Sequence, residues 1–500
     1  VTDEDILATD ALVRHGRGRF ALNTLYSIEI ADPAKDLVED DPTTSVDEKN
    51  VMNSYSFEFT TQDGEWTEAS EVTELVNVSV GAEQSSVAVA SSQYDDSTYS
   101  VWRQLESDNT GIWVSNYLSE SEEWMAASSV NKESGLAAER IDNGLTTVRF
   151  SPQIASSDGG RVVVSWYEKS VSSGFDGVWV NILDQGQWVG AQEVSLNSLT
   201  DASSPDVAID DDGNIVVVWN EIDGDSSAVV SRSYTYQSGS WAWADDVSKI
   251  SGDGDYFVID PKIEMNAHGF ALVVWTQKND SENRIYSNHM NINRSSAWVG
   301  SFAISESTER LGNATNHHIT LGENDDAFAI WTQVSEDRDS IVVNRMASHF
   351  WQGAQLLESE NGGDASSPFV SIGPREKSFA IWSQNDGSQH FITIKEFTPE
   401  SGWGNENIVS ISGKAASTRL SIDAEGNAMA LWNSDGLFGL RYSTQTVEWA
   451  SAANRFDANL TATKDVFDLT TIAQDGRFLA LWYEKLNGED KISSALFSDL

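Results

Sequence analysis

The amino-acid sequence predicts an all-β protein built as one ring of small antiparallel sheets, and three observations predict it. A short apolar run that ends in Trp, a polar residue and usually Gln or Glu recurs along the 500 residues at intervals of roughly 50 to 64. Turn-forming residues separate segments of strand length, and no segment shows a sustained period of 3.6 residues. Repeats of this length are typical of propeller blades, so the predicted fold is a single β-propeller.

Two tryptophan patterns mark the repeat. The first marks the end of the apolar run in eight copies, at Trp102, Trp166, Trp219, Trp275, Trp331, Trp382, Trp432 and Trp482. The second, Trp-x-x-Ala-x-x-Val, begins at Trp66, Trp124, Trp188 and Trp241, with looser copies at Trp298, Trp351, Trp403 and Trp449. Because the two patterns are out of phase, we assign the first to an inner strand and the second to the outer strand of each sheet.

Each unit divides into four strands, and the unit between Pro205 and Val247 illustrates this division. The predicted strands cover 206–209, 215–221, 228–234 and 241–247. The turn Asp211-Asp212-Gly213-Asn214 supplies the positive φ angles that a tight hairpin requires. The second strand is apolar on consecutive positions, so both of its faces must be covered, as happens when a blade packs between two neighbours.

Strand counting predicts nine four-stranded blades, with eight as the alternative. The first set would combine a hairpin over 11–24, a third strand over 53–60 and an outer strand over 66–72. The last unit has no outer strand of its own, so we expect an N-terminal segment at 3–7 to pair there. The whole chain, 1–500, would be one domain with units at roughly 10–75, 85–130, 150–195, 204–250, 258–305, 316–358, 367–412, 417–456 and 466–500.

At these motifs the chain resembles the Trp-rich tandem propeller repeat of secreted and surface-anchored bacterial proteins. The copy at 379–384, Phe-Ala-Ile-Trp-Ser-Gln, followed by Gly-Trp-Gly at 402–404, carries the resemblance, which extends over nearly the whole chain. Sialidases and several polysaccharide lyases share this architecture, but the sialidase-type Asp box, Ser-x-Asp-x-Gly-x-x-Trp, is absent from the sequence. The resemblance therefore implies a fold and carries over no catalytic residue.

Composition excludes several functions. A formal charge of -47, from 78 acidic and 31 basic residues, repels nucleic acids and anionic membranes. Without Cys the chain has no disulfide and no thiolate ligand, and its longest apolar runs, about six residues, are too short to span a bilayer. A polar acidic surface suits salty water, so we expect a secreted or periplasmic protein of a halotolerant bacterium whose signal peptide is absent from this sequence.

Binding residues are expected where the repeats differ from one another. The position just before the buried apolar residue of each first strand varies around the ring, near the mouth of the predicted channel. The candidates for ligand binding are Gln153, Asp206, Lys262, His318, Phe369 and Arg419. The alternative is that these are solvated rim residues with no function.

The same region offers candidates for catalysis. His317 or His318 could act as a base, and Lys262 and Arg419 could stabilise an enolate, as a lyase of acidic polysaccharides requires. Arg149 or Tyr256 are further candidate members of this set. Adjacent residues of a strand point to opposite faces, so at most one of the two histidines would face such a site.

Acidic loops between the second and third strands suggest a third hypothesis, calcium binding. Antiparallel order gathers these loops on one rim, and Ca²⁺ prefers oxygen ligands. The candidate ligands are Asp223, Asp225, Asp280, Glu282, Asp337 and Asp339. No loop has the ordered spacing of a dedicated calcium site, so the alternative is that these acidic loops form a hydrated surface. We expect no cofactor other than calcium.

Taken together, the residues favour a binding or scaffolding propeller, and not an enzyme, that recognises a carbohydrate, a peptide or a protein partner through one rim. The first alternative is a polysaccharide lyase, before a hydrolase. The second is a structural surface protein stabilised by calcium. The sequence leaves the ligand and the oligomeric state open.

Overall fold

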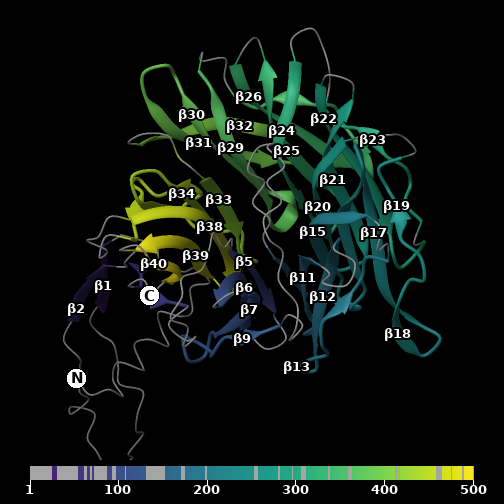
Figure 1. Ribbon diagram of the computed structural model, residues 1–500. Helices are drawn as coiled ribbons and strands as arrows, with labels where there is room; N and C mark the ends of the chain where they lie inside the picture. Colours follow the sequence, from purple (N-terminus) through teal and green to yellow (C-terminus); the bar gives the residue numbers. More distant parts are fainter. Residues whose placement is uncertain are drawn as a thin grey trace, which may run out of the picture.

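The computed structural model shows an eight-bladed β-propeller, with the blades following one another around the ring in chain order (Figure 1). It describes residues 25–30, 55–60, 65–67, 70–72, 87–92, 97–106, 109–130, 152–169, 175–196, 200–252, 257–279, 282–295, 297–305, 311–335, 338–358, 363–411, 415, 417–457, 464–474, 476–486 and 489–498. None of these residues forms a helix that could cross a membrane.

The first four blades are antiparallel meanders whose strands run in chain order from the channel to the outside. The first contains β5 (Val87–Ser92), β6 (Ser97–Glu106), β7 (Asn109–Leu118), β8 (Glu123–Trp124) and β9 (Ser128–Ser129), and the second contains β10 (Gln153–Ser156), β11 (Val162–Lys169), β12 (Asp176–Asp184), β13 (Gln187–Trp188) and β14 (Gln192–Glu193). The third contains β15 (Asp201–Ile209), β16 (Ile215–Asp223), β17 (Ser226–Gln237), β18 (Ser240–Trp243) and β19 (Ser248–Lys249), and the fourth contains β20 (Phe257–Met265), β21 (Phe270–Asn279), β22 (Glu282–Asn291) and β23 (Phe302–Ala303).

The remaining blades repeat this plan. The fifth contains β24 (Leu311–Leu321), β25 (Ala327–Ser335), β26 (Arg338–Ala347), β27 (Phe350–Trp351) and β28 (Gln355–Leu356), and the sixth contains β29 (Ala365–Ile372), β30 (Ser378–Asn385), β31 (His390–Thr398) and β32 (Gly402–Ile411). The seventh contains β33 (Ser417–Ile422), β34 (Ala428–Asn433), β35 (Leu437–Ser443), β36 (Glu448–Trp449) and β37 (Asn454–Arg455), and the eighth contains β38 (Lys464–Gln474), β39 (Arg477–Leu486) and β40 (Glu489–Ser498). A one-turn 3₁₀ helix, η2 (Pro374–Glu376), joins β29 to β30.

Residues that precede the first blade complete the eighth blade. β3 (Glu65–Trp66) and β4 (Ser70–Glu71) both pair with β40 and form its outer strand. The ring is closed further by the Trp124 indole Nε1, which donates a hydrogen bond to Ser494 Oγ at 2.9 Å. Closure by an earlier segment leaves no open edge on the last sheet.

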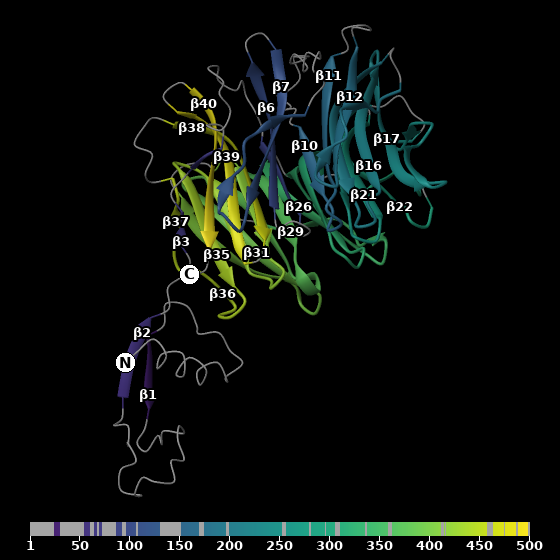
Figure 2. The ribbon, with the colours of Figure 1, turned by 90° about the horizontal axis from the view of Figure 1, so that it is seen from below.

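The prediction of nine blades is therefore wrong, and the alternative of eight is confirmed. The predicted third strand at 53–60 is β2 (Tyr55–Thr60), which among the described strands pairs only with β1 (Leu25–Ile30), and Figure 2 shows this hairpin outside the ring. The predicted outer strand at 66–72 belongs to the last blade, so eight outer strands serve eight blades. The segments at 3–7 and 11–24 lie outside the described residues.

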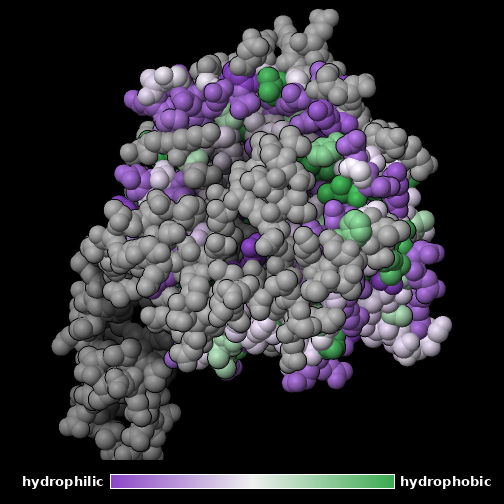
Figure 3. Space-filling view, in the orientation of Figure 1, coloured by the Kyte–Doolittle hydropathy of each residue, from purple (hydrophilic) through white to green (hydrophobic). Residues whose placement is uncertain are grey.

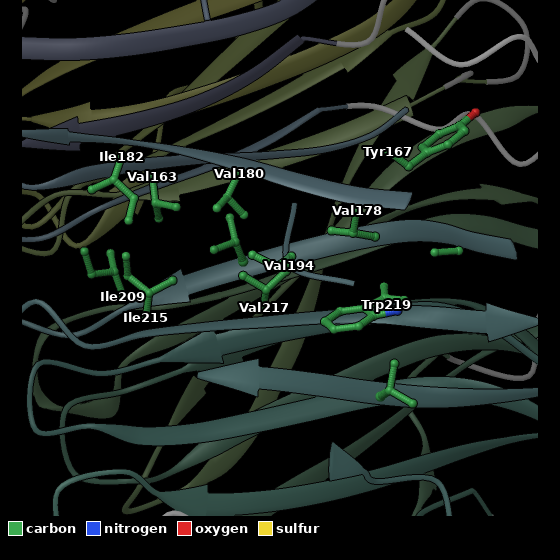
Figure 4. Close-up of a cluster of buried hydrophobic side chains, with 13 residues drawn as sticks. Val163, Tyr167, Val178, Val180, Ile182, Val194, Ile209, Ile215, Val217 and Trp219 are labelled. Atoms are coloured by element: carbon green, nitrogen blue, oxygen red, sulfur yellow. The ribbon is translucent and has the colours of Figure 1, made fainter. Parts of the chain in front are cut away.

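The hydrophobic core lies between blades, because the second strand of each blade is covered on both faces. In the third blade, Val217 and Trp219 pack against the second blade, while Val216 and Val218 pack against the fourth. Figure 4 shows the first of these layers, with Val163, Val178 and Val180 of the second blade facing Val217 and Trp219. The eight repeated tryptophans are at most 2% exposed.

The Trp-x-Gln spacing has a structural cause. Residues two apart in a strand share a face, so the Trp Nε1 can donate to the side-chain oxygen of the Gln. This bond is 3.1 Å from Trp275 to Gln277, 2.8 Å from Trp331 to Gln333 and 2.9 Å from Trp382 to Gln384. A buried indole N–H that would otherwise lack a partner is thereby satisfied within its own strand.

Candidate functional site

The innermost strands form the wall of the channel. Each contacts the innermost strand of the next blade, from β5 through β10, β15, β20, β24, β29 and β33 to β38, which contacts β5 again. Four of these strands, β15, β20, β24 and β29, have a β-bulge in the same place. The bulged residues are non-glycine residues with positive φ, namely Ser204 (50°), Asp260 (54°), Asn316 (53°) and Ser367 (54°).

Each bulge lies two residues before a predicted binding residue, namely Asp206, Lys262, His318 and Phe369. Bulges redirect side chains, and non-glycine residues rarely adopt positive φ. Arg419 on β33 and Gln153 on β10 hold the same register, because each pairs with the residue that precedes the buried tryptophan, as Lys262 does. The sequence comparison therefore chose structurally equivalent positions.

The charged part of this site centres on Lys262. Its Nζ lies 2.9 Å from Asp260 Oδ1, and both side chains are about one-third exposed, at 34% and 35%. Burial alone would lower the pKa of Lys262, but the carboxylates of Asp260 and Asp206 hold it above its usual value. Lys262 is therefore a cation at neutral pH.

Asp206 is nearly buried and accepts hydrogen bonds from two backbone amides, at 3.0 Å from Val207 N and at 2.9 Å from Ile263 N. Burial raises the pKa of its carboxyl to about 6, although Lys262 and the two amides oppose the shift. Burial would also raise the pKa of Asp260, but Lys262 and His317 hold it below its usual value. Two aspartates near one lysine thus have opposite pKa shifts.

The aromatic part of the site spans the fifth, sixth and seventh blades. The ring centroids of His318 and Phe369 lie 3.7 Å apart, and the guanidinium carbon of Arg419 lies 5.5 Å from the Phe369 ring. Burial, together with the charges of Arg419 and Lys262, lowers the pKa of His318 to about 3. The structure therefore brings His318, Lys262 and Arg419 together, with the imidazole neutral.

His317 points away from this group. Its Nδ1 lies 3.2 Å from Thr276 Oγ1 on the fourth blade, and burial lowers its pKa despite the nearby charge of Asp260. Only one of the two histidines joins the aromatic group, as strand geometry requires. Two further candidates, Arg149 and Tyr256, lie outside the described residues.

Sequence reasoning missed Glu264, which stands two residues beyond Lys262 on β20. Desolvation of its carboxyl among the innermost strands, together with the charge of Asp206, raises its pKa to about 8. Residues two apart in a strand point the same way, so reading the next alternate position of each first strand would have found it. Comparison of a single position in each repeat could not find Glu264.

The candidate calcium ligands lie apart from these residues. Asp223 and Asp225 are exposed, and Glu282 Oε2 lies 3.8 Å from an Arg284 nitrogen. Asp339 is exposed, and its backbone N–H donates to Asp364 Oδ1 at 3.1 Å. Asp280 and Asp337 lie outside the described residues, and among the residues that are described no three carboxylates or histidines gather closely enough to hold a metal ion.

No protein-family model and no curated protein matches this sequence. An ulvan lyase of polysaccharide lyase family PL25, bound to a GlcA(1-4)Rha3S saccharide, is 9% identical, with a TM-score of 0.46 over 83% of this chain and 94% of that one. The endo-arabinanase of Bacillus licheniformis is 14% identical, with a TM-score of 0.29 over 55% and 98% of the two chains. The intramolecular trans-sialidase of Ruminococcus gnavus is 11% identical, with a TM-score of 0.33 over 84% and 96%. At this level of similarity neither a substrate nor a catalytic residue carries over.

Proposed function

We propose that this protein is an exported binding propeller that recognises an acidic saccharide at the mouth of its channel. The observation that carries the proposal is the convergence of Lys262, His318 and Arg419 from three different blades. Both cations lower the pKa of the His318 imidazole, whose ring is tilted by 30° against that of Phe369. Such a mixture of fixed cations and ring faces is suited to a carboxylate attached to a sugar ring.

The charge distribution supports an anionic ligand. The chain carries a formal charge of -47, and Lys262 is already paired with Asp260, so the cation that favours an anionic ligand at this site is Arg419. Repulsion from distant carboxylates is screened over about 10 Å at moderate salt, whereas Arg419 acts on a bound ligand directly. Asp260, beside Lys262, can accept hydrogen bonds from sugar hydroxyl groups.

The pKa shifts argue against a lyase that uses either candidate histidine as its base. A general base is efficient when its pKa lies near the working pH. His318, with a pKa of about 3, is a weak base, and His317 faces the fourth blade. The two candidate histidines therefore do not supply the base that a lyase requires.

Calorimetric titration with oligogalacturonides and with uncharged oligosaccharides of equal length tests the proposal. We expect the acidic ligand to bind and the uncharged one to bind at least about tenfold more weakly. The variant Arg419→Gln should lose about tenfold in affinity. Arg375→Gln is the matched control, since Arg375 is exposed on η2, the turn between the first and second strands of the sixth blade, and not in the channel wall.

Equal affinity for acidic and uncharged ligands, or equal losses in the two arginine variants, would contradict the proposal. The same samples should be followed for the ultraviolet absorbance of unsaturated uronate products. Sustained growth of that absorbance, lost in His318→Phe, would establish the lyase instead.

A further inference from the structure

A groove lies on the outside of the ring, at the seam between the fourth and fifth blades. Two adjoining cavities of about 470 and 280 Å³ share three lining residues, among them His289 and Val299, so they form one groove, which we call the seam groove. Phe302 and Phe350 line only the larger cavity, and Arg294 lines only the smaller one. The seam groove therefore has an apolar end and a cationic end.

The cationic end arises from an insertion between the third and outer strands of the fourth blade. The outer Trp298 stands eight residues beyond Met290, whereas the outer Trp351 of the fifth blade stands only five residues beyond the equivalent methionine. The longer connection forms a turn in which Arg294 N donates to Asn291 Oδ1 at 3.1 Å. Function is expected where one repeat departs from the others, and this insertion places a guanidinium beside an apolar groove.

Arg294 decides which charge this end of the groove prefers. Its side chain is exposed, and among the described residues no carboxylate pairs with its guanidinium. Asp325 also lines the smaller cavity, but Asn266 Nδ2 donates to its Oδ1 at 2.7 Å and its Oδ2 lies 2.8 Å from His349 Nε2. Burial, together with the neighbouring imidazole of His349, lowers the pKa of His289, which is consequently neutral at neutral pH.

The walls of the groove expose large apolar side chains. Val299 is 69% exposed, Phe350 is 73% exposed and Phe302 is 38% exposed. Hydrophobic residues are visible on this side of the ring, near β22 and β23 (Figure 3). Apolar side chains that gather in a concave place are typical of ligand sites, whereas single ones scattered over a surface are ordinary.

We propose that the seam groove binds an anionic amphiphile, a carboxylate on an apolar chain of the fatty-acid type. The guanidinium of Arg294 can donate two parallel hydrogen bonds to the carboxylate, and the chain lies along Val299 toward Phe302 and Phe350. Each CH₂ group that these walls remove from water strengthens binding. The larger cavity alone, about 470 Å³, falls within the usual range for small-molecule sites, about 300 to 1,000 Å³.

The net charge of the protein does not oppose this ligand strongly. The formal charge of -47 repels an anion from a distance, but at moderate salt that repulsion is screened over about 10 Å, whereas Arg294 acts on a bound carboxylate directly. The groove shares no residue with the site at the channel mouth, so the two proposals are independent.

Nuclear magnetic resonance of histidine-labelled protein tests the inference, because His289 and His349 line both cavities. The probes are hexanoate, octanoate and decanoate, each added up to about 10 mM, and octan-1-ol as an uncharged probe of the same length as octanoate. We expect saturable shifts of both histidine signals, with affinity rising about twofold or more for each added CH₂ group. Octanoate should bind at least about fivefold more tightly than octan-1-ol.

Variants at the two ends of the groove separate charge from apolar contact. Arg294→Gln should weaken octanoate binding by about tenfold and leave octan-1-ol binding unchanged, and Arg294→Lys should retain most of the affinity for octanoate. Phe350→Ala should weaken the binding of both probes, and because Phe350 is largely exposed its removal leaves folding intact. The matched controls, Arg375→Gln and Tyr236→Ala, change exposed residues of the sixth and third blades and should bind like the parent.

The inference is overturned if octan-1-ol binds as tightly as octanoate, if chain length has no effect, or if Arg294→Gln and Phe350→Ala bind octanoate normally. Dimerisation that is lost in Phe350→Ala and unaffected by octanoate would assign the groove to a second copy of this chain and would also overturn it. Arg419→Gln at the channel mouth should leave the octanoate titration unchanged, so failure here and failure of the acidic-saccharide proposal are distinguishable.

Discussion

At the scale of single residues, position in the ring decides the chemistry of groups that are alike in sequence. Asp206 and Asp260 flank the same lysine, yet the pKa of Asp206 is raised to about 6, whereas that of Asp260 is lowered. Glu264, farther along the same strand as Lys262, has a pKa of about 8 because no cation compensates its poor solvation. Each shift arises from the balance between burial and the nearest charges.

The first prediction concerns Glu264→Gln. In the unfolded chain Glu ionises near pH 4.3, about four pH units lower than in the ring, so Glu264 makes the fold less stable as pH rises from about 4 to 8. The variant removes this ionisation, and we expect it to melt at a higher temperature than the parent near pH 8.5 but not near pH 4.5. Melting curves followed by circular dichroism across this range are the test. A constant difference at all pH values would show that Glu264 does not titrate as described.

The second prediction concerns the protonation of His318. With a folded-state pKa of about 3, below the usual 6.5, its imidazole should stay neutral at pH 5, and it disfavours the fold as pH falls through this window. Arg419→Gln removes one of the charges responsible, so the pKa should rise but remain below 6.5, because burial persists. Imidazole carbon shifts recorded against pH measure both values. Titration of the parent near pH 6 to 7 would restore His318 as a candidate base.

At the scale of elements, polar side chains on the third strands hold neighbouring blades together. Asn181, which is 4% exposed, donates from Nδ2 to Val130 O of the preceding blade at 2.9 Å and accepts from Gly190 N at 3.0 Å. Asn288 and Asn344 make the corresponding pairs of bonds, and each donates one of them to a carbonyl of the preceding blade. The tryptophan of the outer strand adds another bond across the seam, as from Trp351 Nε1 to Ser287 Oγ at 2.9 Å.

The third prediction concerns Asn181→Ala. It leaves one buried carbonyl and one amide without partners, so unfolding should require about 2 kcal/mol less free energy. Chemical denaturation measures this change. Asn324→Ala serves as the control, because Asn324 is exposed and makes a single bond of 3.3 Å to Glu376, so its loss should cost less than about 0.5 kcal/mol. Similar effects of the two variants would refute the role of Asn181 as an inter-blade link.

At the scale of the whole molecule, the ring depends on one short closing segment. β3 and β4 complete the last blade, and Val72 packs with Val87 and Trp102 of the first blade. Trp66 in turn stacks on Phe456 of the seventh blade, with ring centroids 4.4 Å apart. A few residues before the first blade therefore join three blades.

The fourth prediction compares two deletions. Removal of residues 1–62 takes away β1 and β2 but leaves β3 and β4, so the melting temperature should change little. Removal of residues 1–73 exposes the edge of β40, and we expect a lower melting temperature and concentration-dependent association, because an unpaired edge strand recruits other chains. Calorimetry and light scattering measure the two effects. If both deletions behave alike, β3 and β4 do not close the ring.

The repeat predicted both the four-strand unit and the inner strands, because burial on two faces leaves an apolar run that is visible in the sequence, as at 216–219. It could not decide between nine blades and eight. The pairing partner of Trp66 lies at the other end of the chain, and a strand pattern specifies a face but not the sheet that will accept it.

For the candidate binding residues, too, the sequence predicted one part and the tertiary structure decided the other. Variation at one repeat position was enough to choose Lys262, His318, Phe369 and Arg419, since equivalent positions in a closed ring must face one channel. Only the tertiary structure decided that His318 is neutral and that Glu264 belongs with them, because a pKa depends on burial and on charges carried by other blades.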